Sequence, residues 1–480
     1  MMLRHSLLYL PAQVIGPLMQ LVAMVVWTHL VDDHTLGVIT LVIATHELLQ
    51  VAFLAWWSQF ALRFFGRFLK ADDTERFFRT ENAVLCASIV LQSIFATVIL
   101  LSVVAPGSKT ALISATIAYV MTRTLTLYVS ERARVSHQIG IYSVQQILGP
   151  TLGFAAGWVL VELIGPAPEW VLAGFAIAQF AAVALVLPFL NFSFRLRPVD
   201  RDVLKHALHY GAPLIIGGAL SWFGLNAPRF IVNDLLGVAA AGLFAVGYGL
   251  GQRAAAVAAM LVTAAAYPLA VRKMEEKGSA AAMRQLADNG ALLIAIIVPT
   301  VVGIFMLRQD IVALLIAEPF RATTLAILPL SVLSGGIRSA RAHFCDQVFL
   351  LHNRTRLAVL VTGVDAVAAL GFGIAGTLIW GLMGAAMASV AAAAIAALVS
   401  LLLGATRFHL QVPWSHLVRI ALASTAMGAG MMMLPHARSI AFLIVYVGLG
   451  AAIYLLSIGL LYLPWLLRRV GGRVKLSAAE

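Results

Sequence analysis

Charged residues are scarce in this sequence, and their scarcity excludes most classes of soluble protein. Only 11% of the 480 residues are Asp, Glu, Lys or Arg, whereas 61% are apolar and the mean hydropathy is +0.94. Soluble domains have about 25% charged residues. Because a spanning helix takes roughly 20 apolar residues, the composition predicts an all-α integral membrane protein with many transmembrane helices.

Cysteines and catalytic motifs are equally rare. Cys86 and Cys345 both lie inside apolar segments, so neither a disulfide framework nor a cysteine metal site is indicated. The chain has no P-loop, no Gly-x-Ser-x-Gly turn and no His-Glu-x-x-His pair, and its 12 histidines show no metal-ligand spacing. We therefore expect no enzyme, no catalytic residues, no metal and no cofactor.

Apolar runs instead divide the chain into about 14 predicted spans, with no intervening stretch long enough for a soluble domain. The first run is too long for a signal-peptide core, so it is predicted to be retained. The predicted spans are 7–30, 36–60, 83–105, 110–130, 140–164, 170–190, 212–232, 238–268, 290–307, 323–350, 357–379, 382–404, 414–434 and 439–465.

The distribution of Lys and Arg predicts the orientation of these spans. If the N-terminus is cytoplasmic, 24 of the 33 basic residues fall in cytoplasmic segments and only four in outer loops. Cationic loops resist translocation, so both termini are predicted to be cytoplasmic. The net charge of +12 is then a topology signal and an attraction to anionic membrane lipids, and it requires no nucleic-acid partner. Tryptophans near span ends, including Trp27, Trp57, Trp380 and Trp414, are typical of interfacial anchors.

A weak internal repeat predicts the domain organisation. Tyr9 precedes Val31 by 22 residues at the first span, and Tyr210 precedes Val232 by the same spacing at the seventh. Because six helices separate equivalent points, the two copies would have the same orientation. We expect two pseudo-symmetric six-helix lobes, 1–195 and 196–408, followed by helices 13 and 14 with a cytoplasmic tail at 409–480. Such symmetry favours alternating access by rocking of the lobes.

Ionisable residues inside the spans are the candidate site residues, because each costs roughly 2.5 to 3.5 kcal/mol at mid-membrane. The predicted spans contain five arginines but only two well-placed acids, so a cleft lined by them would be cationic and its ligand anionic. Arginine suits phosphate and diphosphate because its planar fork donates paired hydrogen bonds. The candidate substrate-binding residues are Arg123, Arg229, Arg253, Arg338 and Arg341.

The two acids, Glu47 and Asp365, are candidate counter-ions or coupling groups. Asp365 lies at a depth where it could pair with Arg338 or Arg341. The spacing of Ser334, Arg338, Arg341 and Cys345 would place them on one α-helical face. The alternative for each arginine is a structural ion pair or a side chain that extends to the interface.

Several segments together resemble the polysaccharide transporter family, the Wzx-type lipid-linked oligosaccharide flippase branch of the multidrug, oligosaccharidyl-lipid and polysaccharide exporter superfamily. They include Tyr9-Leu10-Pro11, the run from Arg229 through Gly237 to Ala245, Tyr267-Pro268, 350–356 and, most specifically, Gly381-Leu382-Met383-Gly384-Ala385-Ala386. Many relatives carry an Asp immediately before the arginine that matches Arg229, whereas this chain has Pro228.

The resemblance implies a flippase in a bacterial inner membrane. Its cargo would be a polyprenyl-diphosphate-linked glycan, moved from the cytoplasmic to the outer leaflet without ATP hydrolysis by the protein itself. Membrane lipids, a polysaccharide polymerase and glycosyltransferases would be its partners. The pathway, whether lipopolysaccharide, capsule or exopolysaccharide, is left open by the sequence.

Other transporters and enzymes are the alternatives. A major-facilitator transporter also has parallel repeats, but residues 63–68 lack its Gly-x-x-x-Asp-Arg-x-Gly pattern. A multidrug exporter of the same superfamily would have a more acidic or apolar cleft. A membrane-embedded glycan polymerase or acyltransferase would have large outer loops, whereas the largest here is predicted at 308–322.

Overall fold

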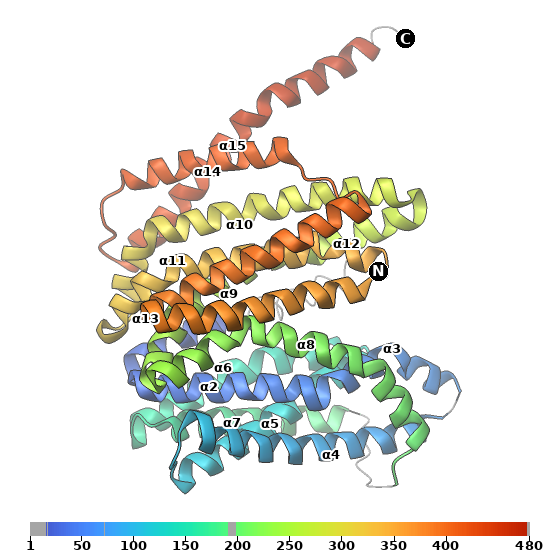
Figure 1. The fold of residues 1–480 in the computed structure, drawn as a ribbon, viewed down its shortest axis with the longest axis vertical. Helices are drawn as coiled ribbons and strands as arrows, with labels where there is room; N and C mark the ends of the chain where they lie inside the picture. Colours follow the sequence, from blue (N-terminus) through green and yellow to red (C-terminus); the bar gives the residue numbers. More distant parts are fainter. Residues whose placement is uncertain (1–15, 17, 72, 191–197, 478–480) are drawn as a thin grey trace. The chain divides into compact units, whose positions relative to one another are not determined.

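The computed structural model describes residues 16, 18–71, 73–190 and 198–477, and all regular structure in these ranges is helical (Figure 1). Tyr9, Leu10 and Pro11, which contributed to the repeat and to the family resemblance, lie outside the described residues. A first helix covers Leu18–Leu30. The following α-helices are α2 (Asp33–Gln50), α3 (Trp56–Lys70), α4 (Thr74–Ile99), α5 (Thr110–Val135), α6 (Ile139–Ile164), α7 (Pro168–Val186), α8 (Arg201–Leu236), α9 (Val238–Lys277), α10 (Ser279–Leu315), α11 (Glu318–Ala340), α12 (Gln347–Leu351), α13 (Thr355–Phe408), α14 (Trp414–Met432) and α15 (Ile440–Ser477).

Short π-helical segments extend three of these helices. They are η1 (Val51–Ala55) between α2 and α3, η2 (Leu100–Val104) after α4, and η4 (Arg341–Cys345) between α11 and α12. A single 3-10 turn, η3 (Leu187–Phe189), follows α7. Because π segments shift the register of side chains, they are often found at functional sites.

The predicted spans are confirmed as helices. Each of the 14 predicted ranges falls on helical backbone where it is described, apart from one or two residues at the ends of some ranges and a turn at Asp346. Ten helices within the described ranges are long and apolar enough to cross a membrane. The predicted break between 357–379 and 382–404 is also present, because Trp380 and Gly381 leave the helical conformation inside α13. Large apolar side chains such as Val98, Phe180 and Leu456 are more than half exposed, as expected for surfaces that face lipid.

Several polar stretches that the sequence suggested as loops are helical in the structure. Polar residues at 61–70, 201–211 and 269–289 continue the apolar helices, so α8, α9 and α10 reach 36, 40 and 37 residues. The expected outer loop at 308–322 is helical except for a two-residue connection at Ile316 and Ala317. Of the tryptophans expected at the interface, Trp380 and Trp414 are exposed, but Trp27 and Trp57 are buried in helix packing.

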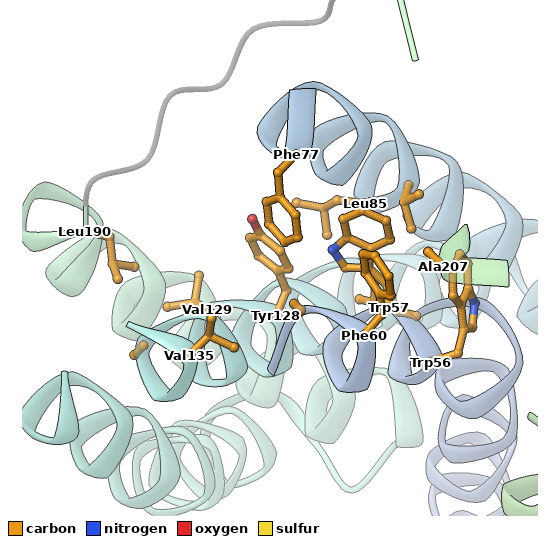
Figure 2. Packing of buried hydrophobic residues seen from close by; sticks show 14 of the residues in the cluster. Trp56, Trp57, Phe60, Phe77, Leu85, Tyr128, Val129, Val135, Leu190 and Ala207 are labelled. Carbon is orange, nitrogen blue, oxygen red and sulfur yellow. The ribbon is translucent and has the colours of Figure 1, made fainter. Parts of the chain in front are cut away.

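The chain forms two compact units, one of 1–246 with 362–388 and another of 247–361 with 389–480. In the first unit, aromatic side chains of α3 and α4 pack with α5 and α8 (Figure 2). Trp57, Phe60 and Phe77 are at most 1% exposed and lie together at the centre of this cluster. The predicted lobes 1–195 and 196–408 and the 409–480 appendix concern internal symmetry and stay a prediction.

The second unit has two apolar cores. One joins α9, α10, α12 and the second half of α13 around Met283, Phe344 and Phe349. The other joins α10 with α14 and α15 around Leu307, Met427 and Tyr446. The same face of α10 that packs on α14 therefore also fixes the position of α15.

Glycines explain the most specific part of the sequence resemblance. Gly381 has φ +58° and ψ −138°, a conformation open almost only to glycine, and it turns the chain between the halves of α13. A Cβ atom on Gly384 would lie 1.8 Å from the carbonyl oxygen of Gly376. Small residues here therefore allow the two halves of α13 to touch backbone to backbone.

Candidate functional site

The first unit holds a buried ion pair between α4 and α5. Arg132 Nη1 lies 3.2 Å from Glu81 Oε2, and the two side chains are 7% and 3% exposed. Trp57 Nε1 donates a hydrogen bond of 3.4 Å to Glu81 Oε1. The Arg132 guanidinium also lies 4.7 Å from the Phe65 ring and 4.5 Å from the Phe78 ring. The Glu81 carboxylate therefore neutralises the Arg132 guanidinium, and the Phe65 and Phe78 rings shield it.

Sequence reasoning did not identify this pair, because it assigned Arg132 to a cytoplasmic loop. The structure instead extends α5 to Val135 and buries Arg132 against α3 and α4. A signal was available, since Glu81 is an acid at the start of an apolar run. Its partner is 51 residues away, a separation that no local pattern can reveal.

Glu47 and Arg123 both lie in the neighbourhood of Tyr119, a buried residue on α5 of the first unit. Glu47 is exposed and Arg123 is half-buried, whereas the neighbouring His46 is only 2% exposed. The structure therefore groups these two predicted site residues around one aromatic side chain.

A buried chain of neutral hydrogen bonds supports this group. The His46 imidazole contacts Thr124 Oγ1 at 3.2 Å, Thr124 donates to Gln92 Oε1 at 3.2 Å, and Gln92 Nε2 donates to Gln50 Oε1 at 3.2 Å. These bonds link α2, α4 and α5. Since buried polar groups that pair with one another fix helix register, the chain positions Glu47 and Arg123.

Arg229 and Asp365 also belong to the first unit. Arg229 is half-buried and donates to Asn226 Oδ1 at 3.1 Å, one turn earlier on α8. Asp365, on α13, is 3% exposed and packs against Gly224 of α8, where a Cβ atom would lie 3.2 Å from its Oδ2. Gly224 thus provides the space that the buried carboxylate occupies.

In the second unit, Arg338 is buried among hydroxyl groups. Its Nη1 donates to Ser389 Oγ at 2.9 Å and to Tyr248 OH at 3.4 Å, and Arg338 is 6% exposed. The two hydroxyls are themselves 3.2 Å apart. These two hydroxyl groups orient the guanidinium of Arg338.

Arg341 pairs with a nearby acid. Its Nε lies 3.3 Å from Asp346 Oδ2, and Asp346 accepts a hydrogen bond from Ser400 Oγ at 2.5 Å. The expected stripe through Ser334, Arg338, Arg341 and Cys345 is not α-helical throughout, because the α-helix ends at Ala340 and residues 341–345 are π-helical. Arg338 and Arg341 are both buried. A pairing of Asp365 with either arginine stays a prediction.

Arg253 is half-buried on α9, beside Gln252. The Gln252 amide donates to Ser334 Oγ at 2.7 Å, so α9 and α11 are joined one turn from Arg338. All three predicted arginines of the second unit therefore lie on connected elements. In the described residues no group of three His, Cys, Asp or Glu side chains is placed to hold a metal ion.

An apolar groove of about 390 Å³ lies elsewhere in the second unit, between α10, α14 and α15. Its lining includes Ile296, Pro299, Ile304, Met427 and Leu455. Pro299 removes one backbone hydrogen bond of α10 beside the groove. Gly303 of α10 and Gly450 of α15, which have no side chains, also line it. The groove has the size and polarity to accept a hydrocarbon chain.

Comparisons with known proteins agree with this architecture. Residues 145–324 match the model of a family described as "Polysaccharide biosynthesis protein". No curated protein matches the chain significantly.

Solved structures show where the fold occurs. The structure titled "Lipid II flippase MurJ, inward closed conformation" superposes with a TM-score of 0.77 at 14% identity, covering 96% of this chain and 100% of that one. An inward-facing multidrug resistance MATE transporter of the MOP superfamily gives 0.60 at 16% identity, covering 84% and 98%. A MOP superfamily transporter from Pyrococcus furiosus, whose title reports a binding pocket of reverse polarity, gives 0.52 at 17% identity, covering 85% and 95%.

These matches confirm the resemblance that the sequence motifs indicated. The matched family segment runs from α6 to α11 and includes Arg229 and Arg253. The chain is thus a multi-pass helical membrane protein whose central segment matches polysaccharide biosynthesis proteins and whose fold is shared with MurJ and MATE transporters.

Proposed function

We propose that this protein flips a polyprenyl-diphosphate-linked oligosaccharide from the cytoplasmic to the outer leaflet of a bacterial inner membrane by alternating access. The observation that carries the proposal is the burial of Arg338 among the hydroxyls of Ser389 and Tyr248. A guanidinium at membrane depth is costly, so its retention favours a role in binding an anion. The family segment and the fold support transport of a glycan lipid.

The cargo has two chemically different parts, and the protein offers a suitable environment for each. Arginine forks in both units suit a diphosphate, because they donate paired hydrogen bonds and stay charged at any working pH. The apolar groove between α10, α14 and α15 suits part of the prenyl chain. Coupling to a proton or cation through Glu47 or Asp365 is part of the same proposal.

A multidrug exporter is the second candidate, and the MATE-like fold favours it. Intramembrane arginines outnumber the two well-placed acids, which suits an anionic cargo better than the cationic drugs of a typical multidrug exporter. A glycan polymerase or acyltransferase is supported less, because α10 and α11 are joined by only two residues where the largest outer loop was expected.

The test is flipping of a labelled polyprenyl-diphosphate sugar in proteoliposomes that contain the wild-type protein. We expect leaflet exchange well above protein-free vesicles, with loss in Arg338→Gln and in Arg253→Gln. Exposed Arg272, which pairs with Glu276 on the surface of α9, provides the matched control Arg272→Gln. If the wild-type protein exports a cationic dye but moves no diphosphate lipid, the flippase proposal is refuted and the multidrug exporter is favoured.

A further inference from the structure

The exposed face of α3 carries three cations around a glycine. Arg63, Arg67 and Lys70 are separated by four and three residues, so they share one face of the helix, and all three are exposed. Gly66 lies between them on the same face. A Cβ atom at Gly66 would meet nothing within 4 Å, which leaves open space over the helix backbone. We define the α3 cation face as Arg63, Gly66, Arg67 and Lys70.

Aromatic rings hold the two guanidiniums in place. The Arg63 guanidinium carbon lies 5.3 Å from the Tyr210 ring centroid and 5.6 Å from that of Phe64, and Arg67 lies 5.0 Å from Phe64. The imidazole of His206 meets the same Phe64 ring edge-on at 5.1 Å. A ring contacts the flat face of a guanidinium, so its N–H edges stay available to an anion.

This support matters because free arginine side chains lose about 2 kcal/mol of rotamer entropy when they are fixed. Phe64 packs against the buried aromatic cluster around Phe60, and Tyr210 belongs to the first turns of α8. The guanidiniums are thus pre-positioned by a rigid surface rather than by a bound ligand.

Apolar side chains flank the cations. Leu62 and Leu69 are 44% and 62% exposed and lie next to Gly66 on the helix surface. The face therefore presents cations beside hydrocarbon, as expected for a ligand with a charged headgroup and an apolar tail. The Lys and Arg distribution puts this end of α3 at the inner membrane surface.

We propose that the α3 cation face binds the diphosphate of a polyprenyl-diphosphate lipid at the inner membrane surface, before the lipid enters the transport path. Three cations match the two to three negative charges of a diphosphate better than the single charge of a phosphodiester headgroup. Bidentate bonds from Arg63 and Arg67 hold the diphosphate over Gly66. The identity of the lipid rests on the proposed function, whereas the binding site rests on α3 alone.

Binding of undecaprenyl diphosphate to the full-length protein in nanodiscs of phosphatidylcholine tests the proposal. We expect the Kd to rise about a hundredfold in Arg63→Gln/Arg67→Gln, since two charge-assisted contacts are removed. Gly66→Leu should weaken binding by filling the space without changing charge. Arg63→Lys/Arg67→Lys should restore part of the affinity. The control Arg272→Gln/Lys277→Gln removes two cations from the inner end of α9 and should change the Kd less than twofold.

Competition distinguishes the sources of phosphate. Labelled undecaprenyl diphosphate is the probe, and unlabelled competitors are added to displace it. If phosphatidylglycerol or inorganic pyrophosphate competes as strongly as unlabelled undecaprenyl diphosphate does, the proposal is overturned. The α3 cation face would then be a general site for anionic lipids or a site for free phosphate. Unchanged binding in Arg63→Gln/Arg67→Gln, in protein that elutes as a single folded species, would overturn it too. Flipping by the wild type is measured separately. If the wild type flips the lipid but every α3 variant binds it with the wild-type Kd, this site is refuted and the proposed function is not. Wild-type protein that flips the glycan lipid but binds no undecaprenyl diphosphate refutes this site and leaves the proposed function standing.

Discussion

Arg132 in the first unit and Arg338 in the second are both buried, yet the contacts described for them differ in chemistry. Arg132 faces the Glu81 carboxylate and two aromatic rings, whereas Arg338 donates to the hydroxyls of Ser389 and Tyr248. A carboxylate cancels the charge of a guanidinium, but a hydroxyl only orients it. Burial alone therefore does not mark a functional arginine, and the chemistry of its partners separates a structural charge from one that can attract an anion.

The largest effect is expected from Arg132→Ala, which leaves Glu81 buried without its partner. Breaking a buried pair in this way costs about 3 to 5 kcal/mol, so the midpoint of thermal unfolding in detergent should fall sharply. Arg132→Met/Glu81→Leu is the control, since removal of both charges should restore most of the stability. If Arg132→Ala has the wild-type unfolding midpoint but no longer flips lipid, Arg132 belongs with the functional arginines.

Arg338→Gln should show the opposite pattern. Its two hydroxyl partners lie 3.2 Å apart and can bond to each other, so unfolding should shift by only about 1 kcal/mol. Flipping of the diphosphate lipid should fall about tenfold, as expected for loss of one charged contact. Equal losses of stability in Arg338→Gln and Arg132→Ala would remove the distinction between the two sites.

Ser389→Asp converts the surroundings of Arg338 into those of Arg132. A carboxylate in place of the hydroxyl 2.9 Å from Arg338 Nη1 would neutralise the guanidinium without removing it. We expect flipping to fall several-fold with unfolding unchanged, whereas the uncharged Ser389→Asn should retain more activity. Transport at the wild-type rate in Ser389→Asp would show that the charge of Arg338 is not used.

The smallest effect concerns an ion pair at the surface. Arg76 Nε lies 2.6 Å from Asp200 Oδ2, and this contact lowers the pKa of Asp200 to about 2. Asp200 also caps α8 through the Asp202 and Val203 amides. Because the unfolded pKa is about 3.9, the pair stabilises the fold fully above that pH and is lost as pH falls through about 2.

Unfolding midpoints measured against pH check this expectation. Asp200→Asn keeps the cap, so it should be slightly less stable than wild type at pH 7 and equal to it near pH 2. Asp200→Ala loses the cap as well and should cost about 1 kcal/mol more at neutral pH. The midpoint of Asp200→Asn should also vary less with salt, because exposed ion pairs are screened.

Comparison of sequence and structure separates two kinds of information. The 14 spans and the break at Gly381 were predictable, because apolar length and glycine conformation act locally. Arg338 and Arg341 were identified as candidate site residues by their position inside an apolar run, and both are buried. The π-helical turn at 341–345 was not predictable, because the sequence of these residues does not distinguish a π turn from an α turn.

By itself, the sequence determined that this chain is a multi-pass helical membrane protein, since the free energy of transfer into lipid adds up residue by residue along each span. It also indicated five arginines inside the apolar runs as candidate site residues, but it missed the buried Arg132. Only the tertiary structure decided which distant groups contact each guanidinium. Arg132 meets a carboxylate 51 positions away, and Arg338 meets a hydroxyl at the same separation. Packing of distant helices sets these partners, and the field at a guanidinium depends on the groups within a few ångströms of it.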